Sequence, residues 1–243
     1  MQTKKIAILQ SNFLSWRGYF DIINTVDEFI IYDHVQYTKN DWRNRNLIAS
    51  KTGPQWITIP VKTKGHLTKN RPINETTVID KKWIKKHLGA FRNNYSKAKY
   101  FKNVYTFLEE IYTSASDYTY LSAINKLFIK RICNLINIKT YISSDIDYII
   151  QGDKNTKLIN LIKQANGTIY YSGIAAKNYL DEELFNKNNI EIRWIDSTNY
   201  PKYKQFCPEY FFNLSIVDLL FMEGNNFYKY MKTIGEVNDM RII

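Results

Sequence analysis

The stretch IAILQSNFLSWRGYFDIINTVDEFIIY, residues 6–32, carries the clearest pattern of secondary structure in the chain. Residues 4–9 are mostly apolar and predict a buried strand, and residues 28–32 predict a second one. Between them, residues 18–25 have the apolar spacing of a short helix. A strand, a helix and a second buried strand in this order indicate a parallel sheet with helical crossovers.

Residues 10–24, QSNFLSWRGYFDIIN, are unusually polar and aromatic for a connection between a strand and a helix. Open α/β sheets bind their ligands beyond the carboxyl ends of the strands, which is where this segment begins. We therefore expect part of a substrate pocket here. Its expected residues are Gln10, Asn12, Trp16, Arg17, Gly18 and Tyr19.

Further elements follow from the same periodicities. Two strands are expected at 47–48 and 55–61, around a turn at 52–54, and a basic loop at 62–74. Three amphipathic helices are then predicted at 81–95, 100–112 and 118–137. After them the alternation resumes, with strands at 140–143, 168–171 and 190–195 and helices at 155–164, 175–185 and 215–221.

The expected fold class is therefore α/β, with a mainly parallel sheet and helices on both of its faces. We expect one Rossmann-like domain over residues 1–243, with the basic loop and a helical insertion at about 62–137.

The net charge of +11 is concentrated in the first part of the chain. Residues 1–100 carry 18 Lys and Arg against 7 Asp and Glu, whereas residues 101–243 carry 16 of each. Within residues 51–100 there are 12 basic and 2 acidic groups. Such a local field favours a polyanionic partner, for example a nucleotide, a tRNA or an anionic membrane surface, although solvated lysines explain it about equally well.

Several classes of protein are not expected. No apolar window is long enough for a membrane span, and no secretory leader is recognisable, so we expect a cytoplasmic protein. Cys133 and Cys207 are isolated and should be free thiols. Three His and two scattered Cys offer no metal-ligand cluster, and no cofactor is indicated.

The polar segment YDHVQYTKNDWRNRN, residues 32–46, is longer than a simple connection requires. Its candidate substrate-binding residues are Asp33, Gln36, Arg43, Arg45 and Asn46, with His34 as a candidate base. Arg45 and Asn46 form the preferred anion clamp, because a guanidinium grips a phosphate or carboxylate with two donors. For Arg43, bracing of the loop through Asp33 or Asp41 is an equal alternative.

Two other segments carry candidate chemistry. The sequence YYSGIAAK, residues 170–177, predicts a strand, a turn of small residues and a helix, so Ser172, Gly173 and Lys177 are candidate phosphate-binding residues. His87 lies on the apolar face of its predicted helix. A histidine there is more often a core residue than a catalyst, but its usual pKa range suits a base that deprotonates an amine.

Six blocks together resemble the WbqC-like family of bacterial surface-polysaccharide gene clusters. They are IAILQSNFLSWRGYFDIIN, FIIYDHVQYTKNDWRNRNLI, WITIPV, GDKNTKLI, IYYSGIAAKNYLDEELF and FFNLSIVDLLFMEG. Members of this family are often labelled glycine transferases, so the resemblance implies a role in O-antigen or lipopolysaccharide synthesis. This chain departs from the family pattern at Ser11 and Ser15, where prolines are usual, and at His34, where an acidic residue is usual.

The first 33 residues are also similar to the opening of the nucleotidyl-transferase superfamily that carries an HxGH signature. Trp16-Arg17-Gly18-Tyr19 stands where that signature would stand. Gly18 fits a helix N-terminus that approaches a phosphate, and Arg17 would supply charge, but both histidines are missing.

The leading hypothesis is an acyl transferase, with glycyl as the expected group, that acts on the amine of a nucleotide-linked amino sugar. Gln10 and Asn12 would hold sugar hydroxyls, Arg45 and Lys177 would hold phosphates, and His87 or His34 would be the base. An aminoacyl-tRNA, a carrier thioester and an adenylate remain open as donors. The alternatives are a nucleotidyl transferase acting on a sugar phosphate and a non-catalytic nucleotide-binding assembly protein.

Overall fold

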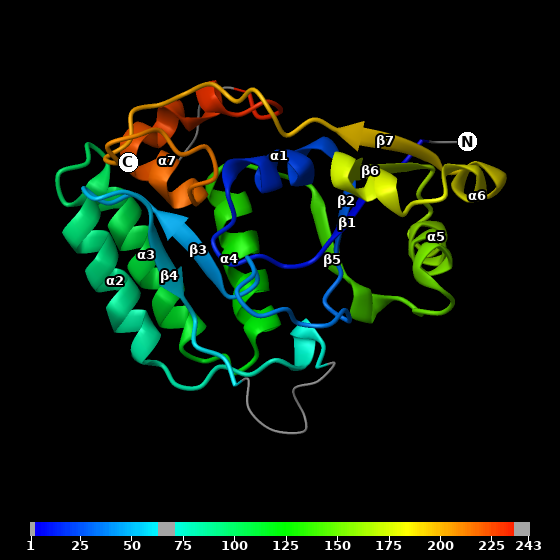
Figure 1. Ribbon diagram of the computed structural model, residues 1–243, viewed down its shortest axis with the longest axis horizontal. Coiled ribbons are helices and arrows are strands. Elements are labelled where there is room, and N and C mark those ends of the chain that lie inside the picture. The colour runs from blue at the N-terminus through cyan, green and yellow to red at the C-terminus, as the bar shows by residue number, and fades with distance from the viewer. Residues whose placement is uncertain (1–2, 63–70, 236–243) are drawn as a thin grey trace.

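The computed structural model of the protein describes residues 3–62 and 71–235. Most of the basic loop expected at 62–74 lies outside the described residues. The rest of the chain forms an α/β fold around a five-stranded parallel sheet (Figure 1). Its strands are β1 (Lys5–Leu9), β2 (Glu28–Ile31), β5 (Tyr141–Ser144), β6 (Ile169–Gly173) and β7 (Glu191–Ile195).

The strand order β5-β2-β1-β6-β7 places a topological switch beside β1. The chain moves outward from β1 to β2 and then to β5, and it later returns to place β6 on the other side of β1. Because the two halves of the sheet wind in opposite directions, their connections diverge at the carboxyl ends of β1 and β6 and leave a crevice there.

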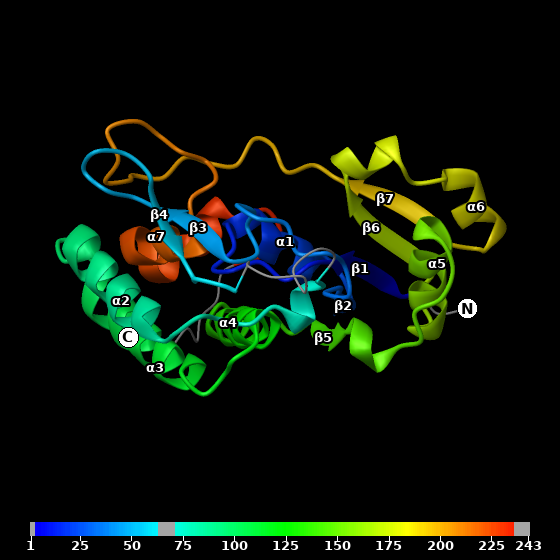
Figure 2. The same cartoon turned by 60° about the horizontal axis from the view of Figure 1, so that its bottom comes forward.

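Alternating side chains of the central strands supply two separate cores. Ala7, Phe29 and Ile31 belong to the larger core, together with α1 (Arg17–Thr25) and α4 (Leu121–Leu135). Ile6, Ile8 and Ile30 point to the other face and belong to the core formed with α5 (Lys154–Gln164) and α6 (Glu182–Lys187). Figure 2 shows these helices on the two sides of the sheet. Buried strands of this kind read as continuous apolar runs, as observed here.

The segment between β2 and β5 builds the other end of the molecule. Strands β3 (Arg45–Ile48) and β4 (Gln55–Thr58) pair antiparallel and form a separate two-stranded sheet. Helices α2 (Lys82–Tyr95) and α3 (Phe101–Ala115) pack beside α4, and α7 (Ile216–Glu223) closes over them. Both ribbon views place α2 and α3 at the end of the molecule opposite α5 and α6 (Figures 1 and 2).

Two predicted elements need correction. The helix expected at 175–185 is wrong, because the chain forms a short 3-10 helix at Ile174–Asn178 and starts again as α6 at Glu182. The Asp181 side chain accepts a hydrogen bond from the Leu184 amide and thereby caps a new helix. The strand expected at 55–61 ends at Thr58, shortly before Pro60, which has no amide hydrogen to donate to a ladder.

Candidate functional site

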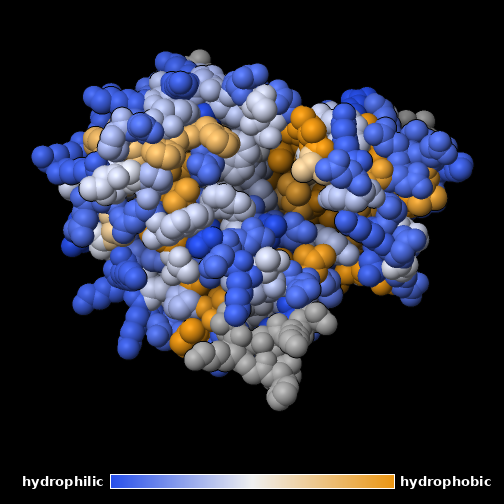
Figure 3. All heavy atoms as spheres, viewed as in Figure 1, coloured by the Kyte–Doolittle hydropathy of each residue, from blue (hydrophilic) through white to orange (hydrophobic). Residues whose placement is uncertain are grey.

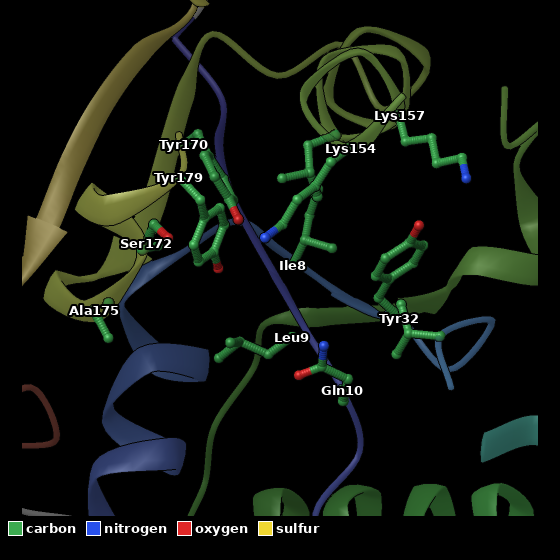
Figure 4. Close-up of a pocket in the computed structure, with 14 residues that line it drawn as sticks. Ile8, Leu9, Gln10, Tyr32, Lys154, Lys157, Tyr170, Ser172, Ala175 and Tyr179 are labelled. Atoms are coloured by element: carbon green, nitrogen blue, oxygen red, sulfur yellow. The ribbon is translucent and has the colours of Figure 1, made fainter. Parts of the chain in front are cut away.

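A cleft of about 430 Å³ lies at the carboxyl ends of β1 and β6 (Figure 4). Its walls come from the ends of these strands, the segment after β2, the first turn of α5 and the 3-10 helix after β6. Figure 3 shows a hollow with apolar walls in this part of the surface. The cleft thus occupies the switch point at which open α/β sheets bind ligands.

Two lysines give the cleft its charge. Lys154 and Lys157 both line it from the first turn of α5, whose N-cap is the Asp153 side chain. The Nζ atom of Lys154 lies 3.4 Å from the centroid of the Tyr179 ring, which holds the ammonium at the edge of the cleft. No carboxylate side chain is among the described residues that line the cleft. The site therefore suits an anionic ligand with an apolar part.

Three tyrosines add hydroxyl groups to the cleft. Burial raises the pKa of Tyr32, and the nearby Asp145 carboxylate raises it further. Burial also raises the pKa of Tyr170 and of Tyr179, so all three phenols are neutral hydrogen-bond donors near neutrality. In Figure 4 the Tyr170 and Tyr179 side chains lie near the Lys154 ammonium, and Tyr32 stands on the Lys157 side.

Of the residues expected from the sequence, Gln10, Ser172 and Gly173 line the cleft. Gln10 follows β1 and its Oε1 accepts a hydrogen bond of 3.2 Å from the Arg43 guanidinium. A Cβ added at Gly173 would meet no atom within 4 Å, so this glycine borders open space. Lys177 does not line the cleft, and its Nζ lies 5.3 Å from the centroid of the Trp194 ring.

Arg43, rather than Arg45, contacts the polar side chains of the loop after β1. Its guanidinium donates to Gln10 and to the Oδ1 atom of Asn12. Arg45 instead lies 4.0 Å above the Trp56 ring and donates to Asn40, so it braces the loop before β3. The expected Arg45-Asn46 clamp is therefore not formed in the cleft.

Asn46 and Tyr19 hold the loop after β1 in place. The Asn46 side-chain amide is buried and donates to the carbonyls of Phe13 and Leu14 at 3.0 and 2.8 Å. The Tyr19 hydroxyl donates to the Gln10 carbonyl at 2.9 Å. Both residues act on the cleft through the backbone, and neither lines it.

The N-terminus of α1 is closed by neighbouring side chains. A Cβ added at Gly18 would lie 2.3 Å from the Trp16 ring, so the indole covers the glycine face that a phosphate would approach. Arg17 is 2% exposed and donates to the carbonyls of Pro201 and Tyr230 and to the Tyr210 hydroxyl. These contacts fix the C-terminal segment, so the expected phosphate contacts of Arg17 and Gly18 are not supported.

Asp33 and Gln36 also lie outside the lining of the cleft. Asp33 is fully buried and accepts hydrogen bonds from the Ser11 amide and the Ser122 hydroxyl, which ties the loop after β1 to α4. Gln36 is exposed and forms an isolated bridge with Pro72.

The two candidate bases have very different surroundings. His87 is 1% exposed, with Nδ1 3.1 Å from the Tyr112 hydroxyl and Nε2 3.1 Å from the Thr58 carbonyl. A carbonyl only accepts, so Nε2 carries the hydrogen and Nδ1 accepts from Tyr112, which leaves no free lone pair. Burial lowers the pKa of His87 to about 4. Its surroundings are those of a structural histidine.

His34 is the better placed of the two. It does not itself line the cleft, but it precedes Val35, which does, and its side chain is 40% exposed. The buried Asp145 carboxylate lies 2.9 Å from Nδ1 and also accepts from the His34 amide. This pairing places the hydrogen on Nδ1 and leaves the Nε2 lone pair available to a substrate.

Sequence reasoning missed Lys154, Lys157, Tyr32 and Tyr179 as cleft residues. A signal was present in GDKNTKLI, residues 152–159, because lysines three apart in the first turn of a helix point the same way. Among residues 3–62 and 71–235 there is no group of three His, Cys, Asp or Glu that could hold a metal ion. Within the same ranges, no helix is long and apolar enough to cross a membrane.

The fold and the cleft define an α/β protein with a candidate anion site at the switch point of a parallel sheet. The sequence pattern of the WbqC-like protein family matches residues 10–230, and the chain belongs to this family. It is 44% identical over 202 residues to the uncharacterized protein Rv1507c of Mycobacterium tuberculosis. The aligned residues cover 83% of this chain and 86% of that protein. No solved structure matches the chain significantly.

Proposed function

We propose that the protein binds a nucleotide-linked amino sugar in the switch-point cleft and transfers an acyl group to the sugar amine. The proposed acyl group is glycyl, in keeping with the label often given to the family. The observation that carries the proposal is the cleft itself, with Lys154 and Lys157 at its edge and no carboxylate in its described lining. Two ammonium groups suit the two phosphates of a nucleoside diphosphate, and the apolar walls suit its base or sugar.

The proposed reaction needs a base beside the amine. The amine nitrogen attacks the acyl carbonyl carbon, the bond from that carbon to its leaving group breaks, and the amine loses a proton. His34 accepts this proton at Nε2 and returns it to the leaving group, while Asp145 holds the imidazole in the required tautomer. The neutral hydroxyl of Tyr32, two residues before His34, supplies a donor for the oxyanion.

Binding is tested with UDP and a UDP-linked amino sugar by isothermal titration calorimetry. Lys154→Ala and Lys157→Ala should each weaken binding at least about tenfold, as expected for loss of a hydrogen bond to a charged group. Lys177→Ala is the matched control, since this lysine follows β6 at the same edge of the sheet but does not line the cleft. Equal affinities in all four proteins would refute the site.

Turnover is tested by mass spectrometry of the amino sugar after incubation with glycine and ATP or with glycyl-tRNA. An acylated product that forms with wild type and is lost with His34→Gln supports acyl transfer. Pyrophosphate release from a nucleoside triphosphate and a sugar phosphate would instead indicate a nucleotidyl transferase. Tight nucleotide binding without any turnover would indicate a binding protein.

A further inference from the structure

A second pocket, of about 230 Å³, is lined in part by Asn12, whose Oδ1 accepts a hydrogen bond from the Arg43 guanidinium. It is lined by Asn12, Ser15, Trp16, Trp42, Asn46, Phe212 and Asn213, and we call it the aromatic pocket. Arg43 links the two sites, because it donates to Gln10 of the cleft and to Asn12 of the aromatic pocket.

The rings of the aromatic pocket form a corner of apolar faces. The Trp16 and Phe212 rings meet edge to face at 89°, with centroids 6.3 Å apart. Trp42 supplies a third ring, which is backed by Trp56 at a centroid distance of 5.4 Å. Phe212 is 63% exposed, and together with the Trp16 and Trp42 rings it presents apolar faces to the pocket.

The polar groups of the aromatic pocket are uncharged. Its lining contains three asparagines and a serine but no described charged side chain. In the described part of the chain, neither the Asn12 Nδ2 atom nor the Asn213 side-chain amide has a hydrogen-bond partner. These two amides can therefore bond to a ligand, whereas the Asn46 amide is used by the backbone.

The walls of the aromatic pocket are fixed before any ligand binds. Leu14 has a φ of +42°, a left-handed conformation that a leucine rarely adopts, and Asn46 holds its carbonyl. The Ser215 amide donates to the Leu47 carbonyl and the Ile216 amide donates to the Ser15 carbonyl, so three distant segments are locked together at this point. A rigid pocket loses little conformational entropy on binding.

We propose that the aromatic pocket binds an uncharged saccharide ring. A pyranose has an apolar face of C–H groups that packs on aromatic rings, and its rim of hydroxyls accepts from and donates to amides. The pocket offers these two features together and no charge, and its volume holds a group smaller than a drug-sized ligand. The proposal does not depend on the proposed function, because the phosphate-binding lysines lie in the other site.

The test titrates the protein with neutral monosaccharides and their methyl glycosides, followed by saturation-transfer NMR and tryptophan fluorescence. Wild type should bind saturably, and Phe212→Ala and Asn213→Ala should each weaken binding by about tenfold. Both residues are partly exposed, so these variants should keep their melting temperature. Tyr141→Ala, which removes an exposed aromatic ring from β5, is the matched control and should bind normally.

A second arm distinguishes the source of the sugar. If the ring belongs to a nucleotide sugar, Phe212→Ala should weaken binding of the UDP-linked sugar, and UDP alone should bind with the wild-type affinity. If it belongs to a separate saccharide, Lys154→Ala should bind neutral sugars normally. No saturable binding of any neutral or UDP-linked sugar, or unchanged affinity in both aromatic-pocket variants, overturns the proposal. A failure of UDP binding alone removes the proposed function and leaves this one standing.

Discussion

His87 and His34 are both imidazoles, but the protein surrounds them differently. The His87 imidazole gives both nitrogens to protein groups in the core, whereas His34 keeps one nitrogen toward solvent and pairs the other with Asp145. The apolar face of the predicted helix already favoured a core role for His87 over a catalytic one. The Asp145 partner of His34 is 111 residues away in the chain, so no local pattern predicted it.

The buried His87 should make the protein acid-sensitive. Its folded-state pKa of about 4 lies below the unfolded value of 6.5, so the unfolded chain takes up the proton first as the pH falls. The stabilisation is complete above pH 6.5 and is lost as the pH falls toward 4, by about 3 kcal/mol in the limit.

Urea unfolding at pH 7 and pH 4 measures this effect. His87→Gln keeps a donor for Thr58 and an acceptor for Tyr112 but does not titrate. Wild type should lose more free energy of unfolding than His87→Gln between the two pH values. An equal loss in both proteins would mean that His87 is protonated in the folded state as easily as in the unfolded one.

At the scale of elements, one tyrosine hydroxyl connects three parts of the fold. The Tyr95 hydroxyl on α2 donates to the Asp218 carboxylate of α7 at 2.6 Å and accepts from the Ala49 amide, just after β3, at 2.8 Å. The Tyr203 hydroxyl donates to the second oxygen of the same carboxylate. Burial raises the pKa of Asp218 to about 6, although both hydroxyls favour its charged form.

Tyr95→Phe should therefore destabilise the fold by about 2–3 kcal/mol, because it leaves a buried amide and a buried carboxylate each short of one partner. Tyr105→Phe is the control, since this hydroxyl accepts a hydrogen bond from Arg92 near the surface and its removal should destabilise by at most about 0.5 kcal/mol. Chemical unfolding of the two variants provides the comparison. A loss for Tyr95→Phe as small as that for Tyr105→Phe would show that water replaces the missing hydroxyl.

At the scale of the whole molecule, positive charge is divided between two ends. The exposed Lys81, Lys82, Lys85 and Lys86 lie on or beside α2, whereas the cleft lysines belong to α5 at the opposite end (Figures 1 and 2). These four lysines are therefore not beside the cleft.

Replacing these four lysines with glutamine should leave the affinity for UDP unchanged, because they do not line the cleft. If a tRNA donor binds to α2, the same change should flatten the slope of log K against log salt by roughly 0.9 for each phosphate that the protein no longer neutralises. Titrations of tRNA and of UDP at several salt concentrations measure both effects. A weaker affinity for UDP in this variant would contradict the separation of the two charged regions.

The alternation of strands and helices follows from the sequence alone, because buried parallel strands read as continuous apolar runs whereas amphipathic helices repeat their apolar residues every three or four positions. It also indicated that Gln10, Ser172 and Gly173 lie at or just beyond the carboxyl ends of strands, since local order along the chain is enough for that. Which arginine contacts Gln10 and Asn12 depends on the tertiary structure, because Arg43 and Arg45 are the same residue type two positions apart and their side chains face different neighbours. The tertiary structure also determines that Lys154 and Lys157 line the cleft. Their position at the cleft depends on β6 returning beside β1, a pairing of residues more than 160 positions apart that no local pattern encodes.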